Sequence, residues 1–338
     1  PNVCITYPDH VATYMSDPNT VVLLDELLTH PELRDKPVAV CGDPASRHGI
    51  ILAKNEPAKK FGVKTAETIW QARRKCPDLY LLPAHHDKYR YYSKLSREIF
   101  ERYTDLVEPF GIDESWLDVT HTIHLFGGDP VALADRLRED MKRELGLTCS
   151  VGVSFNKVFA KLGSDYKKPD AVTVFTRENY KKLIYPLPVR DLLYIGPATE
   201  KKLLSRGIFT IGDIANCDPE ELCAFLGVNG YMLHSFAVGS ENSMVKNCEH
   251  KRGIKSVGNS VTAPRDLVSL EDIKLTFSVL CETVARRLRD SGLKAKKVGI
   301  SVRDSALKTI TNFSREYLFI DSIGIHIVAG CTLKKSTT

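Results

Sequence analysis

The sequence predicts an α+β protein made of several units, and three observations carry this prediction. A chain of 338 residues is too long for a single compact core, so two to four units are expected. Short β-like runs alternate with helical segments on both sides of an acidic motif at residues 110–119, which is typical of a mixed layer. A Gly-turned pair of helical segments near Gly196 and a basic stretch after residue 250 indicate two further units.

The composition is that of an ordinary globular protein, with 43% hydrophobic and 26% charged residues. No apolar run approaches the ~20 residues that a membrane helix needs. Residues 1–20 lack the basic start and apolar stretch of a signal peptide. The nine cysteines contain no CxxC pair and are odd in number, which favours reduced thiols over disulfides or a zinc site. These features predict a cytoplasmic protein.

Hydrophobic periodicity and turn residues predict the elements of the first 184 residues. Strands are expected at 11–16, 37–40, 49–53 and 149–154, and helices at 21–28, 56–61, 65–74, 87–103 and 130–145. The aromatic residues spaced along the helix at 87–103 are predicted to be core rather than a surface that stacks bases. Trp70 and Trp116 are also predicted to be core.

The acidic motif places Asp113 and Glu114 side by side in a run that otherwise reads as a buried β-strand. Burying two negative charges among apolar neighbours is unfavourable unless a positive charge offsets them. Either a paired basic side chain or a metal ion can supply that charge, and the choice decides whether the motif is catalytic.

Three lysines follow the strand that ends at Ser154. Lys157 lies at the start of the predicted helix, Lys161 lies one turn later, and Lys168 lies at its exit. Lysines placed in this way can face a triphosphate or a DNA strand. The same pattern also fits a solvated helix face, and the spacing alone leaves both interpretations open.

Residues 192–203 contain an apolar helix end, a Gly196-Pro197 turn and the start of a second helix. Backbone N–H groups at such a helix start, together with the helix dipole, suit a phosphate oxygen. The pattern is that of a helix–hairpin–helix, which binds a DNA backbone without reading its sequence. Lys201 and Lys202 beside the turn favour this interpretation over a plain helical hairpin.

The last unit is predicted to be a small basic α/β module. Strands are expected at 254–262 and 296–303, and a long helix with one apolar face at 270–289. After residue 250 there are 16 Lys and Arg against 8 Asp and Glu, a net +8, whereas the preceding residues carry −3. A polyanion partner, nucleic acid first, is the favoured interpretation, and a solvated basic surface is the alternative.

Taken together, these motifs resemble the Y-family translesion DNA polymerases, especially the bacterial DNA polymerase IV group and its UmuC-like relatives. The order and spacing of four motifs carry the resemblance, which extends from about Glu26 to Thr309. The motifs are Gly-Ile-Asp-Glu-Ser-Trp-Leu-Asp-Val-Thr at 111–120, Asn-Lys-Val-Phe-Ala-Lys at 156–161 with a later Lys-Pro, the Ile-Gly hairpin at 195–196, and Lys-Ser-Val-Gly-Asn-Ser at 255–260.

The resemblance implies a polymerase right hand with an added little finger. The implied division is an atypical first palm strand at 1–20, fingers at 21–85, palm at 86–184, thumb with the helix–hairpin–helix at 185–248, and an incomplete little finger at 249–338. The tail from Phe313 onward reads as unrelated to the family. The implied partners are primer–template DNA and a dNTP. A sliding clamp is a partner in the family, but no clamp-binding peptide is seen.

The family holds two Mg²⁺ ions on three carboxylates. Asp113 and Glu114 match two of them directly, and the third is an Asp at the end of the first strand. Counting without gaps places Asp17 there, in preference to Asp25. Because adjacent residues of a regular strand point to opposite faces, both members of the pair can serve one cluster only if the backbone bends near Gly111. Asp118 is expected to make a structural hydrogen bond.

The resemblance also assigns residues that bind the nucleotide. Lys168 would contact the incoming triphosphate, with help from Lys59. Val22 stands where the family has an aromatic residue that excludes the ribose 2′-hydroxyl, so weaker rejection of ribonucleotides is expected. Ala53 and Glu56 replace two hydroxyl residues that contact phosphates, and Glu56 is expected to add repulsion.

Gly196, Lys201 and Lys202 in the hairpin, and Lys255 and Arg303 in the little finger, would contact DNA. Two alternatives to an active polymerase remain at this point. One is a catalytically impaired, DNA-binding remnant of such an enzyme, and the other is an unrelated metal-dependent phosphotransferase.

Overall fold

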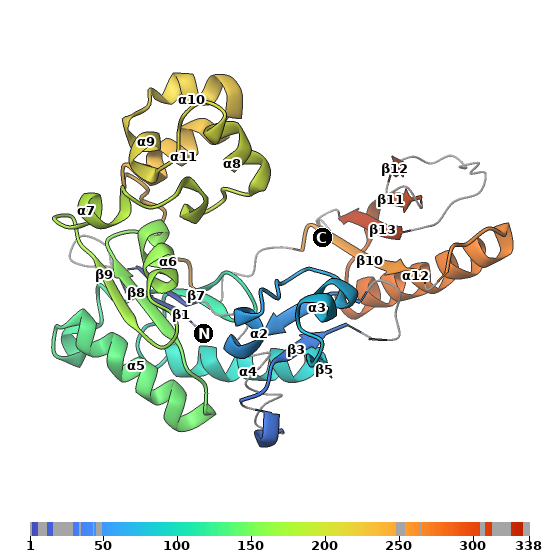
Figure 1. Cartoon of the computed structure of the whole chain (residues 1–338), viewed down its shortest axis with the longest axis horizontal. Helices are drawn as coiled ribbons and strands as arrows, with labels where there is room; N and C mark the ends of the chain where they lie inside the picture. Colours follow the sequence, from blue (N-terminus) through green and yellow to red (C-terminus); the bar gives the residue numbers. More distant parts are fainter. Residues whose placement is uncertain are drawn as a thin grey trace. The chain divides into compact units, whose positions relative to one another are not determined.

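A computed structural model describes the greater part of the chain. The described residues are 2–5, 12–15, 30–33, 35–42, 44, 49–247, 254–263, 265–304, 308–312 and 326–333. They form two compact units: the first comprises 1–41 with 51–250, and the second comprises 42–50 with 251–338 (Figure 1). In the described part, no helix is long and apolar enough to span a bilayer.

A six-stranded sheet lies at the centre of the first unit. Its strands are β1 (Asn2–Ile5), β2 (Ala12–Met15), β6 (Val107–Pro109), β7 (Glu114–Asp118), β8 (Ser150–Ser154) and β9 (Val172–Phe175). β6 pairs antiparallel with β7, and β8 pairs parallel with β9.

The two N-terminal strands pair with the same two strands of this sheet. β1 pairs in parallel with both β7 and β8, and β2 pairs antiparallel with both. Cys4 and Tyr14 each have Trp116 and Gly152 as partners. β2 matches the predicted first strand at 11–16. Its antiparallel direction brings its carboxyl end, Met15, toward the end of β7 that begins with Glu114.

Helices cover both faces of the sheet. α4 (His86–Phe100) and α5 (Pro130–Leu145) share a core with Val151 and Val153 of β8. α6 (Lys157–Tyr166) covers the opposite face, where Gly152 allows the close approach. A Cβ atom at Gly152 would lie 1.9 Å from the carbonyl oxygen of Ala160, so any larger residue would displace α6.

A small sheet in the order β4-β3-β5 carries two short helices. The elements are β3 (Val38–Cys41), β4 (Ile51–Lys54), α2 (Glu56–Lys60), α3 (Ile69–Lys75) and β5 (Tyr80–Pro83). Asn55 joins α2 to the sheet, because its side-chain oxygen accepts from the N–H groups of Val38 and Ala58, both at 3.0 Å.

The second helix of this sheet starts later than the predicted position at 65–74. Thr68 caps it in a reciprocal box with Gln71, which fixes its first residue at Ile69. The prediction that Trp70 is core is wrong. On this two-turn helix Ala72 is buried, whereas Trp70 is 64% exposed and lies under the guanidinium of Arg74.

A helical subdomain follows the large sheet in the chain. It comprises a 3₁₀ turn η3 (Val189–Asp191) and helices α7 (Tyr180–Ile184), α8 (Pro197–Leu204), α9 (Ile211–Asn216), α10 (Pro219–Leu226) and α11 (Asn229–Ala237). Its core is continuous with Phe155 and Phe159 at the start of α6. The sheet and this subdomain are therefore packed through shared apolar side chains.

The second unit is an antiparallel sheet with one long helix. The elements are β10 (Ser256–Thr262), α12 (Leu270–Asp290), β11 (Ala295–Arg303), β12 (Thr309–Asn312) and β13 (His326–Leu333). The predicted apolar face of the helix is confirmed, with Ile273, Leu280 and Val284 buried.

β13 lies in the part of the tail that was expected to be unrelated to the family. It lies between β10 and β11 and pairs with both. The sequence pattern did not reveal this strand, because its place depends on two partner strands that lie far away in sequence.

Candidate active site

The acidic pair lies at a sharp bend rather than inside a regular strand. β7 begins at Glu114, and Asp113 belongs to the bend at 111–113 that precedes it. The N–H groups of Phe110 and Gly111 both donate to the carbonyl oxygen of Glu114, at 2.9 and 3.3 Å. The predicted distortion near Gly111 is confirmed.

This bend brings the two carboxylates to the same place. A Cβ atom built at Gly111 would lie 3.4 Å from Glu114 Oε2 and 3.6 Å from Asp113 Oδ1. Asp113 is buried and Glu114 is partly buried. Both carboxylates therefore have an oxygen near Gly111, and carboxylate oxygens are the ligands that Mg²⁺ prefers.

A basic side chain faces the pair from α6. Lys161 Nζ lies 3.4 Å from Glu114 Oε1, and the two side chains are only 13% and 16% exposed. The same ammonium group lies 2.5 Å from Asp165 Oδ2, one turn further along α6. Asp165 in turn contacts Lys168 Nζ at 2.7 Å. Glu114, Lys161, Asp165 and Lys168 thus form a row of alternating charges.

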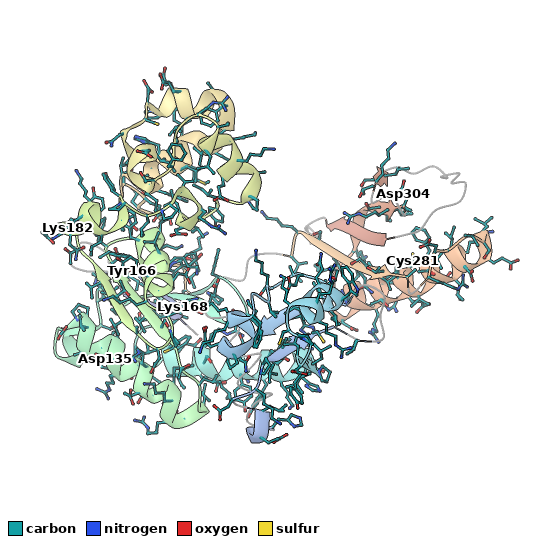
Figure 2. The ribbon with its side chains drawn as sticks, viewed as in Figure 1. Asp135, Tyr166, Lys168, Lys182, Cys281 and Asp304 are labelled. Atoms are coloured by element: carbon teal, nitrogen blue, oxygen red, sulfur yellow. The ribbon has the colours of Figure 1, made fainter. Side chains whose placement is uncertain are left out.

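The lysines of this row lower the pKa of Asp165. Burial by itself would raise the pKa of this carboxyl, but the charges of Lys161 and Lys168 outweigh it and lower the pKa below its usual value. Lys168 follows the carboxyl end of α6, where Tyr166 also lies (Figure 2). Lys161 therefore lies beside Glu114, and Lys168 is linked to it through Asp165. Asp165 was not identified from the sequence.

Lys157 differs from these two lysines, because it is not available to a ligand. Its ammonium lies 2.8 Å from Glu108 Oε2 on β6, and the two side chains are 9% and 7% exposed. It also lies 4.5 Å from the centre of the Trp116 ring, whose Nε1 donates to the Lys157 carbonyl at 2.9 Å. The prediction that Trp116 is core is confirmed.

Glu108 is the second functional candidate that the sequence did not reveal. Besides Lys157, its Oε2 accepts from the N–H of Lys246 at 2.9 Å. This single carboxylate joins β6, α6 and the segment that leaves the helical subdomain. A lone Glu within a short apolar run gives no sign of such a role.

The described residues contain no set of three His, Cys, Asp or Glu side chains that could hold a metal ion. Asp113 and Glu114 supply two oxygen-bearing groups, which suit Mg²⁺. Asp17, Asp25 and Val22 lie outside the described residues. Asp118, predicted to be structural, accepts hydrogen bonds from the Thr120 N–H and hydroxyl at 3.0 and 2.6 Å.

Lys59 and Glu56, the residues of the small sheet predicted to affect nucleotide binding, form an ion pair with each other. Lys59 is exposed on α2, and its ammonium lies 3.1 Å from Glu56 Oε1. Glu56 thus pairs with this lysine, in addition to any repulsion it exerts on phosphates. Ala53 is fully buried in β4.

The predicted Gly196-Pro197 turn leads into α8, but the element before it is the 3₁₀ turn η3 rather than an α-helix. Gly196 is the N-cap of α8, Pro197 is its first residue, and Lys201 and Lys202 are exposed on the helix. Tyr194 precedes them with φ +68°, in the left-handed region that favours glycine, and its side chain is exposed.

The two predicted DNA contacts of the second unit are exposed. Lys255 lies immediately before β10. Arg303 ends β11 and donates to the Thr309 hydroxyl at 3.0 Å across the pair of strands.

Comparison with known sequence families agrees with this arrangement. The impB/mucB/samB family matches residues 22–165, and the C-terminal domain of the same family matches residues 254–321. A SAM-like helix–hairpin–helix tandem matches residues 189–230. The chain belongs to the impB/mucB/samB family.

Named relatives in this family are DNA polymerases. The chain is 55% identical over 285 residues to DNA polymerase IV of Acetivibrio thermocellus, covering 84% of this chain and 71% of that protein. It is 37% identical over 316 residues to DNA polymerase IV of Oceanobacillus iheyensis, covering 93% and 74%. It is 41% identical over 276 residues to DNA polymerase IV of Moorella thermoacetica, covering 81% and 68%.

Solved structures share the fold. A Y-family DNA polymerase chimera of Dbh and Dpo4 matches with a TM-score of 0.83 at 19% identity, over 95% of this chain and 98% of that chain. DinB from Sulfolobus solfataricus matches with a TM-score of 0.66 at 18% identity, over the same shares. These likenesses confirm the predicted α+β polymerase fold. The family matches and the relatives named DNA polymerase IV confirm the resemblance to the Y family.

Proposed function

We propose that this chain acts as the translesion DNA polymerase that its family membership indicates, with the acidic bend as its catalytic centre. The reaction adds dNTPs to a primer 3′ end, directed by a template, during tolerance of DNA damage. The observation that carries the assignment of the centre is the convergence of Asp113 and Glu114 on Gly111, in a chain 55% identical to a DNA polymerase IV.

Asp113 and Glu114 would hold Mg²⁺, with Asp17 as the third ligand. Asp17 is two residues beyond Met15, and the direction of β2 leads from Met15 toward Glu114, which supports this choice over Asp25. When bound, Mg²⁺ supplies stabilisation of the charge that develops on the transferring and leaving phosphate oxygens. The protein's own part is to hold both carboxylates beside one glycine and to exclude solvent from Asp113.

Basic side chains would bind the triphosphate of the incoming dNTP. Lys168 is suited to this role because it lies beside α6, in the charge row that begins at Glu114. Lys59 would assist from α2. With Val22 in place of an aromatic residue, rejection of ribonucleotides is weaker. Replacing Val22 by Phe should raise discrimination against rNTPs, and unchanged dNTP-to-rNTP selectivity would contradict this assignment.

DNA would be bound through its backbone. In the hairpin, Gly196, Lys201 and Lys202 offer N–H groups and positive charge to a phosphate. In the second unit, Lys255 and Arg303 offer two further cations.

This function implies a division of the chain into the parts of a polymerase hand. The division we propose is an atypical first palm strand at 1–20, fingers at 21–85, palm at 86–184, thumb at 185–248 and little finger at 249–338. β13 supplies that last part with a strand, so the sheet of the little finger has four strands.

Primer extension with Mg²⁺ tests the proposed centre. Asp113→Ala should reduce extension on the order of 10³-fold, since each 1.36 kcal/mol of lost transition-state stabilisation is tenfold in rate. Asp105→Ala is the matched control, because this aspartate is exposed before β6 and should leave the rate unchanged. An inactive wild-type chain that still binds DNA in a salt-sensitive way would point to the remnant instead. A chain that binds no primer–template DNA would exclude both nucleic-acid functions.

A further inference from the structure

Lys161 stands between two carboxylates that have different roles. On one side lies Glu114 at 3.4 Å, and on the other lies Asp165 at 2.5 Å. Lys161 and Asp165 are four residues apart on α6, so their side chains lie on one face of the helix. Asp165 is about half exposed, whereas Lys161 and Glu114 are mostly buried.

An ammonium group close to Glu114 competes with any cation that uses the same oxygens. Two unit charges 4 Å apart interact by about 1 kcal/mol even at the dielectric constant of water, and by more in a partly buried site. When a cation takes the Glu114 oxygens, Lys161 still has a carboxylate partner, because Asp165 accepts from the same ammonium. A buried lysine left with no acceptor would be strongly unfavourable, and Asp165 removes that penalty.

We propose that Lys161 is a positioning residue that sets the affinity of the acidic bend for divalent cations. In this proposal Lys161 weakens cation binding at Glu114, and Asp165 is the acceptor that holds Lys161 when a cation takes the Glu114 oxygens. The proposal rests on the proposed role of Asp113 and Glu114 as metal ligands. It assigns separate and opposite effects to two neighbouring residues of α6.

Direct titration with Mn²⁺ tests this without DNA, nucleotide or turnover. Mn²⁺ is a suitable probe because it prefers oxygen ligands as Mg²⁺ does, and the free ion is counted by electron paramagnetic resonance. In the full chain, Lys161→Met should tighten Mn²⁺ binding by at least about fivefold, the effect of removing one unit charge at this distance in a water-like dielectric. Asp165→Asn should weaken Mn²⁺ binding by several-fold, because Lys161 then has Glu114 as its remaining partner among these carboxylates.

A double-mutant cycle shows whether Asp165 acts through Lys161. If it does, Asp165→Asn changes the Mn²⁺ affinity much less when Lys161→Met is already present. If instead Asp165 acts only by its own charge, the two effects add, and the role given to Asp165 is wrong. Lys94→Met is the control for net charge, since Lys94 is an exposed residue of α4 paired with Glu98.

Two further variants separate failure of the inference from failure of the proposed centre. If Asp113→Asn and Glu114→Gln both leave Mn²⁺ binding unchanged, the acidic bend is not the metal site. If they abolish binding but Lys161→Met and Lys161→Gln both leave the affinity unchanged, the centre stands and the role of Lys161 is refuted. Far-ultraviolet circular dichroism of each variant confirms folding. Primer extension then gives a second readout: the Mg²⁺ concentration for half-maximal rate should fall in Lys161→Met and rise in Asp165→Asn.

Discussion

Two lysines of α6, Lys157 and Lys161, lie four residues apart and both face acidic residues of the β6–β7 hairpin. Lys157 is buried between Glu108, whose carboxylate lies 2.8 Å from its ammonium, and the Trp116 ring. Lys161 is shared between Glu114 and Asp165 and lies nearer to solvent. α6 therefore contacts the hairpin in two ways. Lys157 forms a buried ion pair with β6, and Lys161 lies beside the carboxylate at the start of β7. A cation with one buried partner is fixed, whereas a cation with two acceptors can move between them.

Breaking the buried pair should have the largest effect on stability. Lys157→Met leaves the Glu108 carboxylate buried without its cation, and removing one member of a buried pair costs about 3–5 kcal/mol. Lys161→Met should lower the free energy of unfolding by less than Lys157→Met does, because Glu114 is more exposed than Glu108 and Asp165 is about half exposed. Urea unfolding followed by circular dichroism gives both values.

The double variant Glu108→Gln with Lys157→Met sharpens this result. Replacing both charges removes the unpaired ion, so most of the lost stability should return. If the single and double variants are equally unstable, the packing of Lys157 matters and its charge does not. Equal losses for Lys157→Met and Lys161→Met would remove the distinction between the two lysines altogether.

Replacing the buried Trp116 should have an intermediate effect on the free energy of unfolding. The exposed Trp70, the other tryptophan of the chain, serves as the control. Trp116→Phe loses the Nε1 hydrogen bond to the Lys157 carbonyl and weakens the contact with the ammonium, so a loss of about 2 kcal/mol is expected. Trp70→Phe should change stability by less than about 0.5 kcal/mol, because Trp70 is exposed. Urea unfolding again measures both. Similar losses for the two variants would show that Trp116 contributes only apolar area.

Much of this contrast could not be read from the sequence. The pattern at 156–161 correctly placed Lys157 and Lys161 at the start of a helix. It could not say which one faces inward, because Glu108 and Trp116 lie 49 and 41 residues earlier in the chain. Partners across strands are set by sheet register, and register appears only when the strands are assembled.

The bend at the acidic pair could be predicted. The resemblance placed both adjacent carboxylates at one metal cluster, and they cannot serve one cluster from a regular strand, so a bend near Gly111 was expected. Trp70 shows the opposite case. It was predicted to be core, yet the buried position of its short helix is occupied by Ala72. β13 was missed because its place between two other strands is set by those neighbours rather than by its own sequence pattern.

The smallest expected effect is on the dependence of stability on pH. It tests whether the Asp165 carboxylate interacts with Lys161 and Lys168. Lys161 and Lys168 lower the pKa of Asp165 in the folded chain, so the unfolded chain binds its proton more readily. This contribution is fully present above the ordinary pKa of about 3.9 and is lost as the pH falls through the lower folded value. Because Asp165 is about half exposed, the contribution should be below about 1 kcal/mol.

Urea midpoints between about pH 6 and pH 2.5 should fall less steeply in Asp165→Asn than in the wild type. Lys161→Met should show a similar but smaller flattening, since Lys168 still faces Asp165 at 2.7 Å. Identical pH profiles for all three proteins would mean that Lys161 is held by Glu114 alone, and the contrast with the single-partner Lys157 would then disappear.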